Sequence, residues 1–151
     1  MGQGTDGKEL MLVLLDSNIY LSALISPRGI PGEIIRSWQR GRIHVVTCQH
    51  QIDEIREASR NQKFRGRLVP HLVGEMLNNL YNATIWPAPI PRNHHCADPT
   101  DSYLLDLMEA AQPDYAVTGD KRSGLLEIGK LGRTSILSAT EFSSSVLHPA
   151  G

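Results

Sequence analysis

An apolar run that ends at a carboxylate constrains the fold of this chain most. Residues 11–15 (MLVLL) are all apolar, and Asp16 follows them at once. A strand that is apolar on both faces is typical of the centre of a parallel sheet, where helices cover each side. Ser17 and Asn18 come next and are residues that favour a helix start. The sequence therefore predicts a buried strand that leads directly into a helix, with a charge at the junction.

The rest of the chain alternates between helical periodicity and short strand-like runs. Further strands are predicted over residues 43–47, 83–86, 115–119 and 134–138. Helices are predicted over residues 17–26, 31–40, 50–59, 67–81, 101–111 and 125–130. This alternation predicts an α/β fold, a three-layer α/β/α sandwich around a central, mostly parallel sheet.

Length and composition are those of one globular domain. The chain has 151 residues, of which 40% are hydrophobic and 21% are charged, close to the average of folded proteins. A chain of this length buries roughly two-thirds of its unfolded surface. We predict a single domain over residues 10–146, a flexible N-terminal tail at residues 1–9 and a C-terminal tail at residues 147–151.

Charge, hydropathy and cysteine usage exclude several classes of protein. The formal net charge of −1 gives no overall attraction to nucleic acid or anionic membranes, so such binding requires a local patch. No apolar run approaches the roughly 20 residues that span a bilayer, and the N-terminus lacks the pattern of a signal peptide. Cys48 and Cys96 form no CxxC motif and suit reduced thiols. We expect a cytoplasmic protein with no membrane partner.

Four acidic residues stand where the predicted elements would bring them together. Asp16 and Asp120 each follow an apolar strand, and the carboxyl ends of parallel strands line one crevice. Glu54 lies early in the helix after the second strand, and Asp101 begins the helix after a Pro-rich loop. If the strands of Asp16 and Asp120 are neighbours, all four carboxylates converge.

Converging carboxylates are ligands for a hard divalent cation. Without a cation, their charges repel and raise one another's pKa. Mg²⁺ and Mn²⁺ prefer carboxylate and water oxygens, and such an ion binds phosphate and activates water for phosphodiester hydrolysis. Each acid alone also fits a structural role: Asp16 suits a helix N-cap, Glu54 a solvated helix face, Asp101 a first helical turn and Asp120 a turn. The constellation, not any single residue, favours the metal site.

The same four segments resemble the motifs of PIN-domain ribonucleases. LLDSNIYLSAL (14–24) resembles their first strand and helix, and HQIDEIREASRNQKF (50–64) resembles the helix that carries their Glu. DPTDSYLLDLMEAA (98–111) is similar to the third motif and DYAVTGD (114–120) to the fourth. Within the family, the chain is similar to bacterial toxin components of toxin–antitoxin pairs (VapC-like), which tend to carry SAL, a P-x-G turn, KF and VTGDK. The resemblance covers about residues 11–140.

The resemblance implies a PIN-like endoribonuclease that depends on Mg²⁺ or Mn²⁺. Its catalytic, metal-binding acids would be Asp16, Glu54, Asp101 and Asp120. Asn18 and Thr118 would be polar supports, and Asp98 is an alternative to Asp101 as a ligand. Adjacent helix residues point about 100° apart, so only one of Asp53 and Glu54 faces the site. The resemblance also implies an RNA substrate, a cognate antitoxin and a homodimer.

Basic residues offer a weaker candidate for RNA binding. Arg56, Arg60 and Lys63 recur at i, i+4, i+7 spacing, and Lys121 follows Asp120. Such a stripe would hold RNA phosphates, although a solvated helix face has the same pattern. These residues alone do not distinguish the two roles.

Other functions have less support in the sequence. His94, His95 and Cys96 are adjacent, but a zinc site needs further ligands, for which Cys48 is a poor candidate. The aromatic content of 5% argues against recognition by base stacking, and Trp86 sits in an apolar context. The remaining alternative is a non-catalytic PIN-like module that binds nucleic acid or protein.

Overall fold

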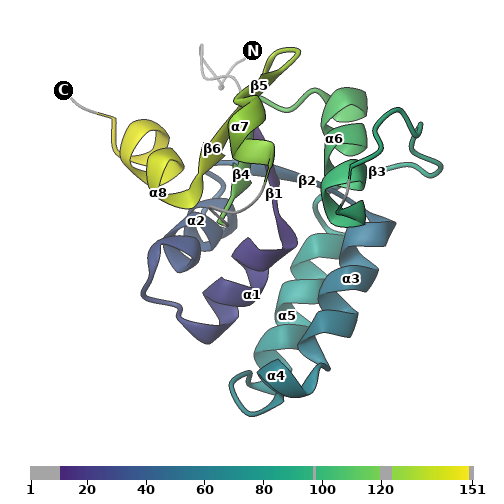
Figure 1. Cartoon of the computed structure of the whole chain (residues 1–151). Helices are drawn as coiled ribbons and strands as arrows, with labels where there is room; N and C mark the ends of the chain where they lie inside the picture. Colours follow the sequence, from purple (N-terminus) through teal and green to yellow (C-terminus); the bar gives the residue numbers. More distant parts are fainter. Residues whose placement is uncertain (1–10, 97, 120–123, 150–151) are drawn as a thin grey trace, which may run out of the picture.

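Strands and helices alternate along the chain (Figure 1). The computed structural model describes residues 11–96, 98–119 and 124–149, apart from the side chains of residues 63 and 65. The strands are β1 (Leu12–Leu15), β2 (His44–Cys48), β3 (Thr84–Trp86), β4 (Tyr115–Thr118), β5 (Lys130–Leu131) and β6 (Thr134–Ser138). The helices are α1 (Ser17–Ile25), α2 (Ile30–Gln39), α3 (Gln49–Ser59), α4 (Gln62–Arg65), α5 (Pro70–Tyr81), α6 (Pro99–Ala111), α7 (Leu125–Ile128), α8 (Ala139–Phe142) and the π-helical turn η1 (Ser143–Leu147). In this part of the chain, no helix has both the length and the hydropathy of a membrane span.

The strands form one sheet with β1 near its centre. Their order is β3-β2-β1-β4-β6-β5, and all neighbours are parallel except β5 and β6. From β1 the chain moves outward to β2 and β3, then returns to the opposite side of β1 with β4. β1 and β4 therefore form the switch point of the sheet, where connections leave in opposite directions and open a crevice at the carboxyl ends.

Helices cover both faces of the sheet. On one face, Val13 and Leu15 pack in a core with residues of α1, α2, α3 and α5. On the other face, Leu14 packs in a second core with residues of α6 and α7. Successive side chains of a strand point to opposite faces, so the run at residues 12–15 must be apolar throughout. The predicted three-layer fold with a mostly parallel sheet is confirmed.

Several helix boundaries differ from those predicted; α6, for example, begins at Pro99 and not at Asp101, and two others have a clear cause in the backbone. The helix expected over residues 67–81 begins at Pro70, because proline suits a first turn and disfavours helical backbone at Val69, which has φ −88° and ψ 118°. The helix expected over residues 125–130 ends at Ile128, because Gly129 has a positive φ of 71° and leads into β5. The elements α4, β5, α8 and η1 were not predicted, since they are too short to show a periodicity.

The C-terminal segment packs against α2. Leu147 is buried in the same core as Val13. The Ser143 hydroxyl donates to Glu33 of α2 at 2.6 Å, and His148 Nε2 lies 2.6 Å from the other Glu33 oxygen. Packed structure therefore continues past residue 146, where the sequence suggested that the domain ends.

Candidate active site

The junction of β1 and α1 buries a carboxylate at the carboxyl end of the central strand. Asp16 is 8% exposed and is the N-cap of α1, where its Oδ1 accepts from the backbone N–H of Asn18 at 3.2 Å. Thr118, at the end of the neighbouring β4, donates its hydroxyl to Asp16 Oδ2 at 3.1 Å. Because β1 and β4 pair in parallel, their carboxyl ends lie side by side, and the hydrogen bond from Thr118 to Asp16 joins them. The helix-capping role of Asp16 therefore does not prevent its carboxylate from also contacting the end of β4.

Burial and neighbouring acids raise the pKa of Asp16. Removal of the carboxylate from water is the largest cause, and the charges of Glu54 and Asp101 add to it. The hydrogen bonds from Asn18 and Thr118 act in the opposite direction. The ionised form of Asp16 is therefore held where a positive charge would stabilise it.

Three hydroxyl groups hold the carboxylate of Glu54. Ser17 donates a short hydrogen bond to Oε1, and Tyr103 donates to the same oxygen at 2.9 Å. Thr100 donates to Oε2 at 3.3 Å. Burial, followed by the charge of Glu54, raises the pKa of Tyr103, so its hydroxyl remains a donor. These contacts tie α3 to the starts of α1 and α6.

A buried glutamine lies behind this layer of hydroxyls. Gln51 is fully buried and donates to the Leu15 carbonyl at 2.6 Å and to the Ser17 hydroxyl at 3.4 Å. Its own carbonyl accepts from the Thr47 hydroxyl of β2 at 2.7 Å. Gln51 therefore links the end of β1, the end of β2 and the residue that contacts Glu54.

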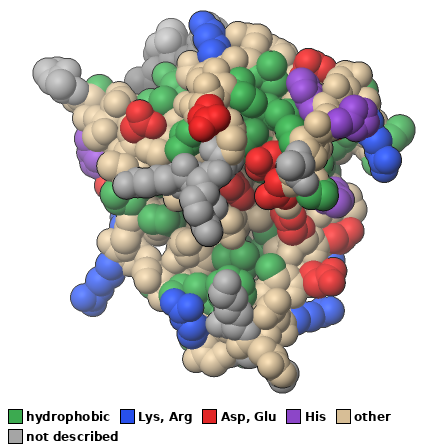
Figure 2. Space-filling model, in the orientation of Figure 1, with side chains coloured by type: hydrophobic (Ala, Val, Ile, Leu, Met, Phe, Trp, Pro, Cys, Tyr) green, Lys and Arg blue, Asp and Glu red, His purple; other side chains and the backbone are tan. Residues whose placement is uncertain are grey.

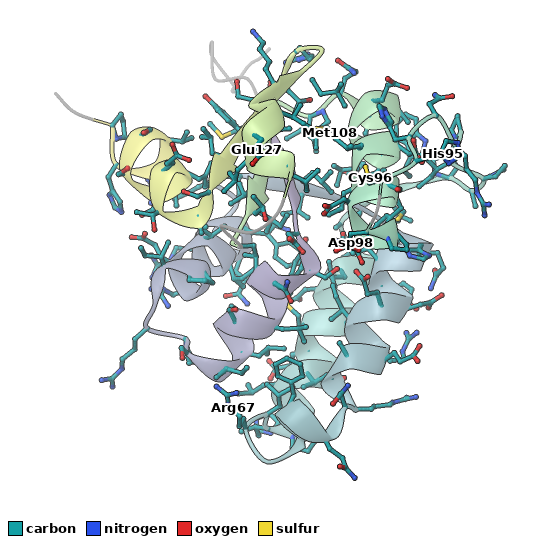
Figure 3. The ribbon with its side chains drawn as sticks, viewed as in Figure 1. Arg67, His95, Cys96, Asp98, Met108 and Glu127 are labelled. Atoms are coloured by element: carbon teal, nitrogen blue, oxygen red, sulfur yellow. The ribbon has the colours of Figure 1, made fainter. Side chains whose placement is uncertain are left out.

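The two acids at the start of α6 have different positions. Asp98 is exposed and caps α6, where it accepts from the backbone N–H of Thr100 at 2.9 Å (Figure 3). Asp101 is in the first turn, and its charge contributes to the raised pKa of Asp16. Of this pair, Asp101 is the acid whose charge is among the causes of the raised pKa of Asp16. Figure 2 shows acidic side chains gathered near the middle of this face of the molecule.

The structure also separates Asp53 from Glu54. Asp53 is exposed and pairs with Arg56 at 3.0 Å, whereas Glu54 faces Ser17 and Tyr103. Asn18 is exposed, and its backbone N–H is the group that contacts Asp16. The predicted site residues Asp120 and Lys121 lie outside the described residues.

The basic residues Arg56, Arg60 and Lys63 do not belong to one continuous helix, as their spacing predicted. α3 ends at Ser59, so Arg60 is its C-cap and Lys63 belongs to α4, which breaks the i, i+4, i+7 spacing. Arg56 donates to the Tyr81 hydroxyl at 2.7 Å and lies 5.9 Å from the centre of that ring. Arg56 is thus engaged with α5 and Asp53, which gives it a structural role.

Sequence reasoning missed the groups that orient the acids. Ser17 and Thr100 are each one position from a predicted acid, and Tyr103 is two positions from one. Gln51 precedes Glu54 by three residues, so both lie on the same face of α3. Proximity in the sequence to the predicted acids could therefore have indicated these residues. It does not show which of the nearby polar side chains point toward the acids.

The chemistry of the donor set fits a hard divalent cation. The oxygens of Asp16, Glu54 and Asp101 are the ligand type that Mg²⁺ and Mn²⁺ prefer, and burial, with a smaller contribution from the charges of Glu54 and Asp101, raises the pKa of Asp16. The described residues alone contain no group of three His, Cys, Asp or Glu side chains placed to hold a metal ion. That finding also gives no support to zinc at His94, His95 and Cys96, while Asp120 lies outside the described residues.

Comparison with protein families identifies the fold. A family model described as PIN domain matches residues 12–122, which run from β1 through β4 and include all four predicted acids. No curated protein and no solved structure matches the chain. PIN domains are usually nucleases that use divalent metal ions such as Mg²⁺. Because the match covers most of its length, the chain belongs to the PIN-domain family.

Proposed function

We propose that this protein is a metal-dependent endoribonuclease that hydrolyses phosphodiester bonds of RNA. The observation that carries the proposal is the buried Asp16 at the switch point, with the charges of Glu54 and Asp101 close enough to raise its pKa. A carboxylate that only caps a helix needs no acidic neighbours. Their presence disfavours the ionised state unless a cation compensates it, and family membership supports a nuclease.

In this proposal the acids hold the cation and the polar residues around them hold the acids. Asp16, Glu54, Asp101 and Asp120 would bind Mg²⁺ or Mn²⁺, which supplies positive charge for the phosphate and acidity for the attacking water. Thr118 orients Asp16, while Ser17 and Tyr103 orient Glu54. Because these bonds exist before substrate arrives, little reorganisation is needed during the reaction.

The test is cleavage of end-labelled single-stranded RNA in Mg²⁺ or Mn²⁺, with EDTA as a control. We expect Asp16→Asn to lose at least about 100-fold in rate and Glu54→Gln about 10- to 100-fold, as for groups around metal sites. Asp53→Asn is the matched control, because it removes the same charge one residue from Glu54 on the exposed face. It should cleave at the wild-type rate.

Three results would contradict the nuclease proposal. They are cleavage that continues in EDTA, cleavage that survives Asp16→Asn, and no cleavage of several RNAs in either metal. The last result, together with measurable RNA binding, would favour a non-catalytic binding module.

We further propose that the nuclease is the toxin of a toxin–antitoxin pair and forms a homodimer. Similarity of its motifs to bacterial toxin components supports this. A groove of about 210 Å³ between α1, α2 and α5, lined partly by Leu24, Ile35, Leu72 and Met76, offers apolar surface for a protein partner.

Induced expression of the wild type should arrest bacterial growth, expression of Asp16→Asn should not, and co-expressed antitoxin should relieve the arrest. Normal growth with an active nuclease would reject the toxin role alone, and light scattering would test the dimer.

A further inference from the structure

A larger groove adjoins the acids on the side of α3 and α6. Its volume is about 740 Å³, and its walls are α3, the first half of α6 and the Pro-rich segment 88–96 that follows β3. Glu54, Thr100 and Tyr103 line it, so it is continuous with the candidate active site. Its volume lies within the range of about 300–1,000 Å³ that is usual for ligand sites.

Hydrogen bonds fix the Pro-rich wall of this groove to α6. Asp106 is 6% exposed and accepts from the backbone N–H groups of Asn93 and His94, both at 2.9 Å. The Asn93 side chain donates to Glu109 at 2.8 Å, and the Cys96 N–H donates to the Ser102 hydroxyl at 2.6 Å. The wall is therefore preformed, which lowers the entropy lost when a ligand binds.

Ring side chains from three elements line the groove. Trp86 comes from β3, His50 from α3 and Tyr103 from α6. His50 is exposed, and its ring lies 4.4 Å from that of Tyr103 at an interplanar angle of 60°. The low aromatic content suggested that base stacking was disfavoured. The fold nevertheless gathers these three rings in one groove beside the acids, and rings of this kind are groups on which bases can stack.

The lining of the same groove also includes an arginine and histidines. Arg92 and His95 are exposed on the Pro-rich wall, and His95 stands out on that segment in Figure 3. Figure 2 shows histidine and basic side chains to the right of the acidic side chains at the middle of this face. A guanidinium always carries positive charge, so Arg92 can contact a phosphate while the neighbouring base enters the groove.

We infer that this groove binds the unpaired base of a nucleotide next to the scissile phosphate, with Trp86 and His50 as stacking surfaces and Arg92 as a phosphate contact. The inference rests on the proposed nuclease function. Bases in an RNA duplex are stacked and paired, whereas bases of single strands can enter such a pocket.

Binding is tested without cleavage by NMR, using the two tryptophan indole N–H signals of the protein. The probes are the four nucleoside 5′-monophosphates in Mg²⁺, and Trp86→Phe assigns the signals. We expect the Trp86 signal to shift saturably with at least one nucleotide, while the Trp38 signal and an inorganic phosphate control do not. His50→Ala should weaken binding about fivefold or more, as expected for loss of a stacking surface.

Cleavage is the second arm of the test. On a single-stranded RNA, His50→Ala and Arg92→Ala should raise KM about fivefold or more and leave kcat nearly unchanged. Arg28→Ala is the matched control, because Arg28 is exposed and does not line the groove. A Trp86 signal that no nucleotide moves, or wild-type Kd and KM in His50→Ala, would overturn the inference. Cleavage without a Trp86 shift would reject the base site alone, and a shift without cleavage would reject the nuclease proposal alone.

Discussion

Replacing Gln51 with leucine tests whether the buried amide holds the end of β1. Gln51 is fully buried, with the Leu15 carbonyl at 2.6 Å and the Thr47 hydroxyl at 2.7 Å. Leucine fills a similar space but offers no hydrogen bond, so both groups lose this partner. A buried polar group that loses its partner costs about 1–3 kcal/mol. We expect Gln51→Leu to lower the free energy of unfolding by about 2–4 kcal/mol, which lowers Tm by roughly 4–16 °C in a chain of this size.

Urea denaturation at pH 7 in EDTA measures this loss. The midpoint should fall while the m-value stays the same, since the surface exposed on unfolding is unchanged. Gln49→Leu is the control, because Gln49 belongs to the same helix but is exposed, with Asp53 at 2.9 Å. It should stay within about 0.5 kcal/mol of wild type. Equal losses in the two variants, or a loss below about 1 kcal/mol in Gln51→Leu, would refute the role assigned to the amide.

Three further predictions concern other buried groups. Because the pKa of folded Asp16 is raised above its ordinary 3.8, the folded state loses stability as pH rises past that value. Asp16→Asn should therefore raise the urea midpoint at pH 7 in EDTA, by less as the pH is lowered, and Mg²⁺ should stabilise only the wild type. Gly32→Ala would place a Cβ 1.9 Å from the Pro27 carbonyl oxygen and should cost about 1–3 kcal/mol or more. Gly74→Ala, where a Cβ meets no described atom within 4 Å, should instead gain up to about 1 kcal/mol in thermal denaturation. Tyr20→Phe should stabilise the protein by about 1 kcal/mol in the same assay, since the buried Tyr20 hydroxyl has no partner among the described residues.

The elements of the fold were predictable because their signals are local. The apolar run at residues 12–15 and the polar start of α1 follow each other in the sequence, and the structure has β1 and α1 at those places. The order of strands is not local. Convergence of the acids required β4 to pair with β1, and the structure shows this pairing, with Leu15 opposite Val117.

The acids of the candidate site were predictable, but the residues that hold them were not. Asp16, Glu54 and Asp101 belong to recognisable motifs. The contacts of Ser17 and Tyr103 with Glu54 join residues 37 and 49 positions apart. Nothing in the sequence around a serine or a tyrosine specifies such a partner. The groove beside the acids could not be predicted from the sequence for the same reason, because its walls come from α3, β3 and α6, which are far apart in the sequence.

Asp16 and Glu54 are held in different ways, which argues for different roles in the proposed site. Both oxygens of Glu54 accept from hydroxyl groups, and Oε1 accepts from two. Asp16 accepts one long bond on each oxygen, at 3.2 and 3.1 Å. A carboxylate oxygen has about two lone pairs, so the described contacts leave Asp16 more capacity to bind a cation than Glu54. In Glu54→Gln, the amide oxygen can still accept from Ser17 and Tyr103, whereas Asp16→Asn removes the charge of the carboxylate with more free acceptor capacity among the described contacts. This difference is the physical reason to expect the larger loss of cleavage in Asp16→Asn.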